Sequence, residues 1–170
     1  MKKSLKLFFF YIFIFLSSNG YSDEKKIVYL NLEYIFQNSK PGKLILEDLN
    51  TIKKVNIEKF KLKENELRNT EQDLIKKKNI LSNEEFNSKA RALNEEMKEY
   101  NEMRENALSE FEENKKKKLN EFLAKITPLI ENFVKENSIN IVLNQKNLFI
   151  ASKNFDITDQ IVQIVNENIK

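Results

Sequence analysis

The side chains that most often perform catalysis are scarce in this chain of 170 residues. It contains no histidine and no cysteine, so the common acid–base, nucleophilic and zinc arrangements are not available to it. Carboxylates could share a proton at three pairs, Glu84-Glu85, Glu95-Glu96 and Glu112-Glu113, but adjacent helical residues do not share a face. Gly42 is the only glycine after residue 22, which excludes a glycine-rich phosphate loop. We therefore expect a protein that is not an enzyme and that uses no cofactor or metal.

Two groups of side chains suit binding rather than catalysis. Lys76, Lys77 and Lys78 could attract an anionic lipid surface or form an ordinary solvated face, and the same holds for Lys115–Lys118. The second group has helical spacing and could pack against another helix or contact another polypeptide, since Met and Tyr suit adaptable, amphipathic surfaces. Its members are Phe86, Met97, Tyr100 and Met103.

The first 22 residues have the layout of a secretory signal peptide. A basic start, MKKSLK, precedes the apolar run Leu7–Leu16, which is shorter than the roughly 20 residues that a membrane-spanning helix needs. Gly20 and Ser22 fit the small-residue rule for cleavage, so we expect cleavage after Ser22. Cleavage after Gly20 and an uncleaved membrane anchor are the alternatives.

The signal segment accounts for the excess of positive charge. The full chain has 29 basic and 26 acidic residues, and three of the basic residues, Lys2, Lys3 and Lys6, lie in that segment. The remaining chain has 26 of each and no net charge. Because a nucleic-acid-binding domain usually carries a basic footprint, we expect no nucleic-acid partner.

A long antiparallel helical hairpin is predicted over residues 43–136, with its tip near residues 78–83. Its first helix, Lys43–Leu81, repeats apolar residues every seventh position, which is a coiled-coil signal. These residues are Phe60, Leu67, Leu74 and Leu81. Ser82 and Glu85 form a capping box that starts the second helix, Asn83–Glu136, within which Thr127-Pro128 predicts a kink or a restart.

The seam between the two predicted helices is incomplete. Lys63, Thr70 and Lys77 occupy core positions that a stable coiled coil would fill with apolar side chains. We therefore expect the two helices to bind each other weakly, to bend and to splay.

Short β segments and one more helix are predicted at the two ends of the hairpin. Ile27–Leu30 is a predicted strand, and Asn38–Gly42 is a predicted turn. Ile139–Leu143 and Leu148–Ser152 are predicted to form a β-hairpin around Asn144–Asn147. Asp156 is expected to cap a last helix. The apolar face of that helix comprises Ile157, Ile161, Val165 and Ile169.

These end segments, residues 23–42 and 137–170, are expected to form one small body from which the arm, residues 43–136, projects. Fewer than 60 residues make a marginal core, so we expect copies of the chain to associate through their strands. The candidate association residues are Ile27, Val28, Leu30, Ile139, Ile141, Leu143, Leu148, Phe149 and Ile150.

The chain resembles the Skp, or OmpH, family of periplasmic chaperones over almost all of residues 23–170. The specific part of the resemblance lies in two terminal stretches, KIVYLNLEYIFQNSKPGK and INIVLNQKNLFIASKNFDITDQIVQIVNEN. Within the second stretch, the order of β-hairpin, short loop, DIT and amphipathic helix is similar to the C-terminal pattern of the family. The charged middle of the chain would match many coiled coils.

The resemblance implies a mainly α protein with a small β body, forming a jellyfish-like homotrimer. Strands from three subunits would build a central barrel-like body, and three arms would enclose a cavity. Unfolded outer-membrane β-barrel proteins would be held in that cavity in the periplasm, without ATP. Members of the family often have basic arm tips that bind anionic lipid or lipopolysaccharide. The balanced charge of this chain departs from that pattern, and Lys76–Lys78 are its remaining candidates.

On this interpretation Phe86, Met97, Tyr100 and Met103 are candidate client contacts. The alternative function, from a different class, is a structural coiled coil that spaces or tethers envelope components. A spacer would be expected to have a continuous heptad seam, whereas the seam here has gaps.

Overall fold

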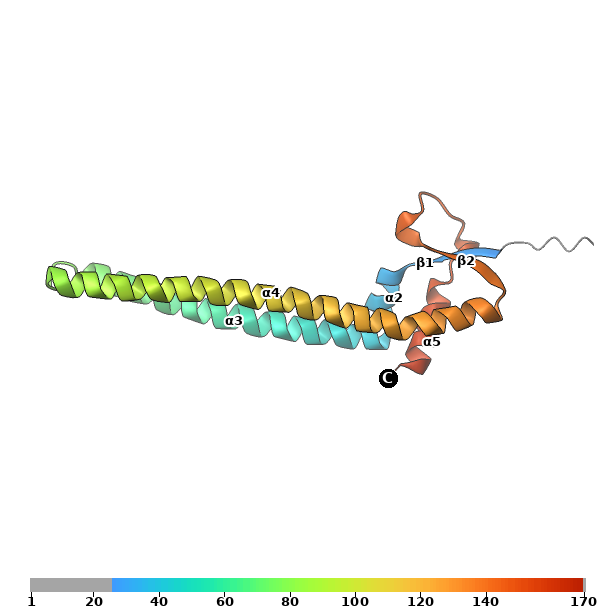
Figure 1. Ribbon diagram of the computed structural model, residues 1–170, viewed down its shortest axis with the longest axis horizontal. Coiled ribbons are helices and arrows are strands. Elements are labelled where there is room, and N and C mark those ends of the chain that lie inside the picture. Colours follow the sequence, from blue (N-terminus) through green and yellow to red (C-terminus); the bar gives the residue numbers. More distant parts are fainter. Residues whose placement is uncertain (1–25, 170) are drawn as a thin grey trace, which may run out of the picture.

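The computed structural model of the protein describes residues 26–169, so the predicted signal peptide lies outside the described residues. A long two-helix arm projects from a small body of two strands and short helices (Figure 1). In chain order the elements are β1 (Lys26–Leu30), α2 (Leu32–Asn38), α3 (Lys40–Lys76), α4 (Asn83–Glu136), β2 (Ile139–Asn144), the 3-10 turns η1 (Gln145–Asn147) and η2 (Lys153–Phe155), and α5 (Thr158–Asn168). We call α3 and α4 the arm and the other elements the body.

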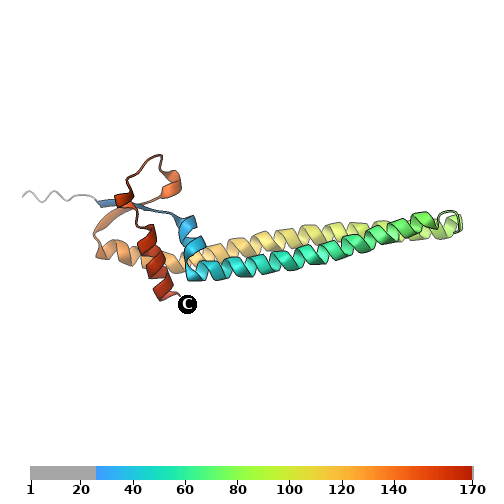
Figure 2. The same ribbon diagram turned by 180° about the vertical axis from the view of Figure 1, so that it is seen from behind.

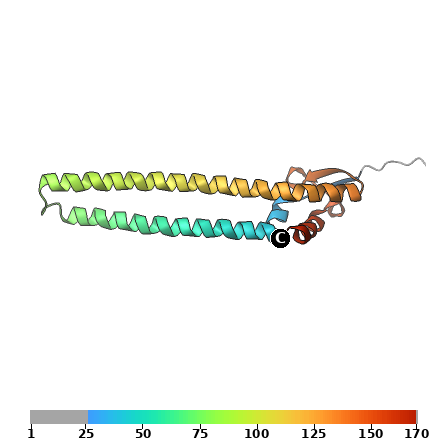
Figure 3. The same cartoon turned by 60° about the horizontal axis from the view of Figure 1, so that its bottom comes forward.

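The arm is an antiparallel pair of helices, and Figure 3 shows them side by side from the body to the tip. α4 has 54 residues and is therefore about 80 Å long at 1.5 Å per residue. It starts at a capping box, in which the Ser82 hydroxyl accepts a hydrogen bond from the Glu85 N–H and the Glu85 carboxylate accepts one from the Ser82 N–H. The predicted capping box and the predicted bounds of the second helix are confirmed.

The first helix of the arm differs from the prediction at both ends. It begins at Lys40 rather than Lys43 and ends at Lys76 rather than Leu81. Leu81, the last member of the heptad series, instead lies in the tip turn, where its N–H donates to the carbonyl of Lys77 at 3.0 Å. The heptad repeat thus continues by one step beyond the end of the helix in the structure.

The predicted turn at Asn38–Gly42 is wrong, because two helices meet there. Buried Ser39 ends α2 by donating its N–H to the Ile35 carbonyl, and its hydroxyl accepts from the Gly42 N–H at the start of α3. Pro41 fits the first turn of α3, where a missing N–H leaves no hydrogen bond unmade. The short helix α2 was not predicted; its N-cap is Asn31, whose side chain accepts the Tyr34 N–H at 2.8 Å.

β1 and β2 form a two-stranded parallel sheet in which Ile27 pairs with Ile141 and Leu30 pairs with Asn144. The direction follows from the arm, because α4 runs back toward the body and the chain must then reverse before β2 begins. Ser138 makes this reversal in the left-handed conformation, with φ of 52°. β2 therefore runs in the same direction as β1.

The predicted β-hairpin after the arm is also wrong. Its first strand is confirmed as β2, but residues 145–147 form η1, and Leu148–Ser152 contains no strand. A later segment uses the other edge of β1, because the Ile157 N–H donates to the Tyr29 carbonyl at 3.0 Å and Asp156 forms a β-bridge with Tyr29. Figure 2 shows the segment between β2 and α5 as a loop that stands away from the sheet.

The core of the body is built from both ends of the chain and from the last third of α4. Its buried side chains are Val28, Leu30, Ile35, Phe122, Ile126, Ile139, Ile157, Ile161 and Val165. The Phe36 ring packs edge-on against Phe122, with 5.0 Å between the ring centroids. The arm is therefore anchored by α4, whose residues Phe122 and Ile126 are part of this core.

α4 continues through Thr127 and Pro128, so the predicted restart of the helix is wrong. The Thr127 hydroxyl donates to the Leu123 carbonyl at 2.7 Å, while Pro128 has no N–H for the carbonyl four residues earlier. Figure 1 shows the axis of α4 changing direction in its orange part, as a proline inside a helix leads one to expect.

The last helix, α5, follows the prediction in its buried face, but its N-cap position is Ile157 rather than Asp156, and Ile169 lies just past its last residue. Asp156 accepts hydrogen bonds from the N–H and the hydroxyl of Thr158, where the helix begins. Ile157, Ile161 and Val165 are buried in the core, so the predicted apolar face is confirmed for these three residues.

Candidate functional site

The seam between α3 and α4 is held at a few separated points. Leu49, Leu67 and Leu93 are buried in it. Phe60 and Tyr100 pack edge-on, with 6.1 Å between their ring centroids. Two ion pairs also cross it, Lys63–Glu96 at 3.4 Å and Lys118–Asp48 at 2.9 Å. Because both are solvent-accessible, each contributes little to stability.

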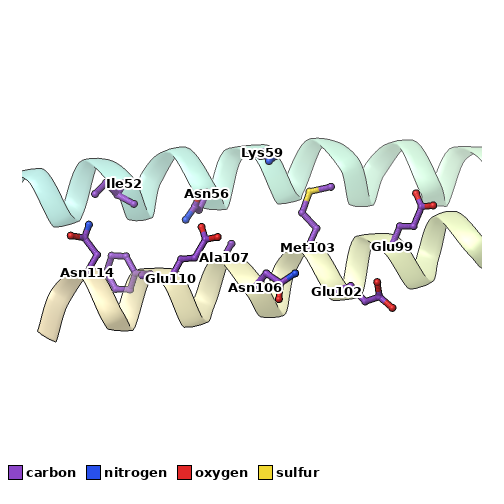
Figure 4. Close-up of a pocket in the computed structure, with 11 residues that line it drawn as sticks. Ile52, Asn56, Lys59, Glu99, Glu102, Met103, Asn106, Ala107, Glu110 and Asn114 are labelled. Carbon is purple, nitrogen blue, oxygen red and sulfur yellow. The ribbon is translucent and has the colours of Figure 1, made fainter. Parts of the chain in front are cut away.

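Between these points the seam contains cavities, and Thr70 and Lys77, two of the predicted gap positions, line one of about 320 Å³. A cavity of about 770 Å³ lies midway along the arm (Figure 4). The polar side chain of Asn56 and the small side chain of Ala107 both line it, and in Figure 4 Met103 extends from α4 toward α3. An amide opposite an alanine cannot fill the space between two helices as a pair of leucines would.

A second cavity, of about 390 Å³, lies on the other side of the same stretch of seam. Asn56, Ala107 and Phe111 line both cavities. The residues that line only one of the two cavities lie on different sides of the seam. On α4, for example, Met103 of the larger cavity and Arg104 of the smaller one point about 100° apart around the helix. The two cavities therefore open on either side of the seam, on opposite faces of the arm.

The four predicted contact residues do not form one stripe. Phe86 and Tyr100 are half-buried, and Tyr100 packs on Phe60, so for Tyr100 packing against the first helix is confirmed. Met97 and Met103 are more exposed, but Met103 lines the 770 Å³ cavity and Met97 lines a different one of about 200 Å³ with Leu67. Only these two methionines are open to a partner.

At the tip, Lys76, Lys77 and Lys78 lie at the end of α3 and in the turn that follows it, and all three are exposed. Lys76 pairs with Asp73 at 3.4 Å, which offsets part of the local positive charge. Ile75 and Ile80 are exposed beside these lysines. The tip is thus both cationic and apolar.

The predicted association residues are divided between the core and the surface of the body. Val28, Leu30 and Ile139 are buried within the single chain. Exposed members are Ile27, Ile141, Leu143, Phe149 and Ile150, of which Phe149 and Ile150 have 101% and 86% of their surface accessible. Leu148 is half-buried, and neither it nor Phe149 or Ile150 belongs to a strand.

Some exposed apolar side chains were not predicted as functional. Ile57 and Leu108 line the 390 Å³ cavity and are 55% and 64% exposed. Neither belongs to the heptad series, and this departure from the repeat was the signal that could have revealed them. Apolar residues outside the packing stripe of a helix are candidates for contact with a partner.

Hydrogen bonding perturbs two ionisable groups of the arm. The hydrogen bond to Glu66 raises the pKa of Lys63 above 10.5, assisted by Glu96 across the seam and opposed by desolvation. The hydrogen bonds from the hydroxyl and the N–H of Ser82 lower the pKa of Glu85 below 4.5. Both shifts arise from contacts within the arm.

Within residues 26–169 no group of three or more acidic side chains is arranged to hold a metal ion. No helix in this part of the chain is long and apolar enough to cross a membrane. The features that remain are surfaces, namely the two faces of the arm, its tip and the exposed edge of the body.

The protein is mainly α-helical, with a two-helix arm that projects from a small body containing a β-sheet (Figure 1). A family model described as outer membrane protein (OmpH-like) matches residues 26–165, and the chain belongs to this family. The predicted family resemblance is thereby confirmed.

The fold is similar to the crystal structure of a protein from Caulobacter crescentus CB15 described as an outer membrane chaperone (OmpH-like). The TM-score is 0.78 with 18% sequence identity, and the match covers 86% of each chain. None of the curated proteins matches the chain in sequence.

Proposed function

We propose that this protein is an ATP-independent holdase of the periplasm that binds unfolded outer-membrane β-barrel proteins and prevents their aggregation. The observation that carries the proposal is the arm, in which cavities alternate with packed contacts and apolar side chains stay exposed. Membership of the OmpH-like family supports the class of client.

The chemistry of the arm suits an unfolded client. Unfolded β-barrel chains expose apolar side chains and unpaired strand edges, and both lead to aggregation. Exposed residues such as Ile57, Leu108 and Met97 can cover apolar client segments through weak contacts that impose no fixed conformation. The client leaves when its apolar surface becomes buried in the membrane, so the cycle needs no nucleotide.

We further propose that the working form is a homotrimer whose three arms surround the client. The outward apolar side chains of Ile141, Leu143, Phe149 and Ile150 support association of the bodies, since a single chain leaves them in water. Several arms on one body also raise the effective concentration of binding surfaces around one client.

Two measurements on the mature chain, residues 23–170, test these proposals. Light scattering follows the aggregation of a β-barrel protein diluted from urea, and near-stoichiometric amounts of the chain are expected to suppress it. No suppression at large molar excess contradicts the holdase function. Sedimentation equilibrium tests the assembly, and a stable monomer contradicts the trimer.

The alternative, a structural spacer or tether, predicts one fixed partner. Crosslinking in the periplasm distinguishes the two functions, because a holdase gives many unfolded clients and a spacer gives a single product. The cavities in the seam favour the holdase, since a spacer depends on stiffness and a gapped seam is not stiff.

We also propose a weak contact of the tip with anionic lipid or lipopolysaccharide. Lys76–Lys78 supply positive charge, and Ile75 and Ile80 can enter the headgroup region. Cosedimentation with phosphatidylglycerol vesicles at low salt tests this contact. Binding that is equal with phosphatidylcholine vesicles contradicts it.

A further inference from the structure

The two faces of the arm differ in charge at the same distance from the body. On one face the 770 Å³ cavity is lined by three carboxylates, Glu99, Glu102 and Glu110, and by one lysine, Lys59 (Figure 4). We call this side the acidic face. A negatively charged segment of polypeptide approaching it would be repelled.

The 390 Å³ cavity on the opposite face has the reverse character. Ile57 and Leu108 form an exposed apolar surface there, and Lys53 and Arg104 line the same cavity. Neither cation takes part in an ion pair among residues 26–169. The one carboxylate of this cavity, that of Glu112, already pairs with Lys115 at 3.4 Å. We call this side the basic–apolar face.

The basic–apolar face continues toward the body. Lys115 and Leu119 follow Leu108 by seven and eleven residues, spacings that return to nearly the same side of a helix. Both line a third cavity, of about 650 Å³, at the root of the arm, together with Leu46, Lys146 and one carboxylate, that of Glu33. A client segment on this face would therefore meet apolar and cationic side chains over both cavities.

We infer that the basic–apolar face is the side of the arm that meets the client, and that it selects segments in which apolar residues are interspersed with carboxylates. The inference rests on the proposed holdase function. Apolar client side chains would cover Ile57 and Leu108, while client carboxylates would pair with Lys53 and Arg104. The zero net charge of residues 23–170 gives no sign of this segregation, because it sums over both faces.

Two sets of matched variants test the inference. Lys53→Glu with Arg104→Glu reverses the charge of the basic–apolar face, and Lys59→Glu with Lys117→Glu makes the same change in net charge on the acidic face. Lys117 lies seven residues after Glu110 and so shares its face. Leu108→Ser and Leu62→Ser are the apolar pair: the two leucines are 64% and 72% exposed, and Leu62 lies three residues after Lys59.

The binding probes are two fluorescein-labelled unfolded peptides with the same apolar residues, separated by Asp and Glu in one and by Lys in the other. Fluorescence anisotropy measures their Kd for each variant. We expect wild type to prefer the acidic peptide, and Lys53→Glu with Arg104→Glu to weaken its binding about fivefold, as for the loss of two exposed ion pairs. Leu108→Ser should weaken the binding of both peptides. The acidic-face variants should bind the acidic peptide at least as tightly as wild type does.

Each other outcome has a definite meaning. Equal losses in the matched variants overturn the inference while leaving the holdase function in place, provided that wild type still suppresses client aggregation. If wild type suppresses no aggregation and binds neither peptide, the proposed function and the inference both fail. A change of oligomeric mass in Lys53→Glu with Arg104→Glu, measured by light scattering, would identify this face as an interface between copies and would also overturn the inference.

Discussion

Replacing Gly42 by alanine tests the close approach of α2 and α3. A Cβ atom added at Gly42 would lie 1.8 Å from the carbonyl oxygen of Phe36 and 2.7 Å from its carbonyl carbon. Both are backbone atoms, so no rotation of a side chain can relieve the overlap. Reaching the 3.0 Å at which real Cβ contacts begin would require the two backbones to move about 1.2 Å apart.

Two opposing terms set the size of the expected effect. Alanine favours a helix over glycine by at most about 1 kcal/mol, while forcing an extra carbon into a packed site costs about 1–3 kcal/mol or more. The overlap is with backbone and its relief would displace α2 from the core, so the steric term should be at the upper end. We expect Gly42→Ala to lower the free energy of unfolding by about 2 kcal/mol.

Urea denaturation followed by far-UV circular dichroism measures this change, at one fixed protein concentration because association affects the midpoint. Lys43→Ala, at the next and exposed position, is the control and should change the free energy of unfolding by less than about 0.5 kcal/mol. A Gly42→Ala protein as stable as wild type, or more stable, would refute the reasoning, because α2 would then not lie against α3 as described.

Three further predictions concern the core, the cap and the surface. Ile161→Ala should lower the free energy of unfolding by about 3 kcal/mol in the same urea assay, because Ile161 is fully buried; a loss below 1 kcal/mol would contradict the core assignment. Ser82→Ala removes the hydroxyl hydrogen bond, the larger of the two causes that lower the pKa of Glu85, and keeps the backbone N–H bond; the lost contribution is present above pH 4.5 and disappears as the pH falls through the folded pKa. Its thermal midpoint should therefore lie below that of wild type at neutral pH and approach it in acid; a difference independent of pH contradicts this. Phe149→Ser with Ile150→Ser should keep the helical content but lower the mass in sedimentation equilibrium, and an unchanged mass would exclude these residues from the interface.

The long elements could be predicted from the sequence because local chemistry determines them. Ser82 and Glu85 satisfy each other's backbone at the start of α4, and such a cap depends only on residues three positions apart. The spacing of Ile157, Ile161 and Val165 likewise fixed the buried side of α5. The gaps at Thr70 and Lys77 in the heptad series predicted a loosely packed seam, and a cavity of about 320 Å³ lies there. The cavities beside Asn56 and Ala107 were not predicted.

The errors came from contacts between distant segments. Leu148–Ser152 has the composition of a strand, but η1 stands in place of the predicted turn and the segment does not pair with β2. The segment that joins the sheet instead is Asp156 and Ile157, on β1, which a local pattern cannot reveal. Pro41 and Gly42 suggested a turn, whereas the glycine is needed because the backbone of α2 lies against it. The two-faced charge of the arm also escaped the sequence analysis, which considered net charge and single lysine runs.

The parallel pairing of β1 with β2 has a consequence for how the chain folds. Ile27 pairs with Ile141, so closing the sheet directly from an unfolded chain would require a loop of more than one hundred residues and its entropy cost. If α3 and α4 form first, their hairpin brings the two strands together and removes most of that search. The core then becomes complete only when Ile161 and Val165 arrive, so a chain that emerges from its N-terminus completes the arm before the body.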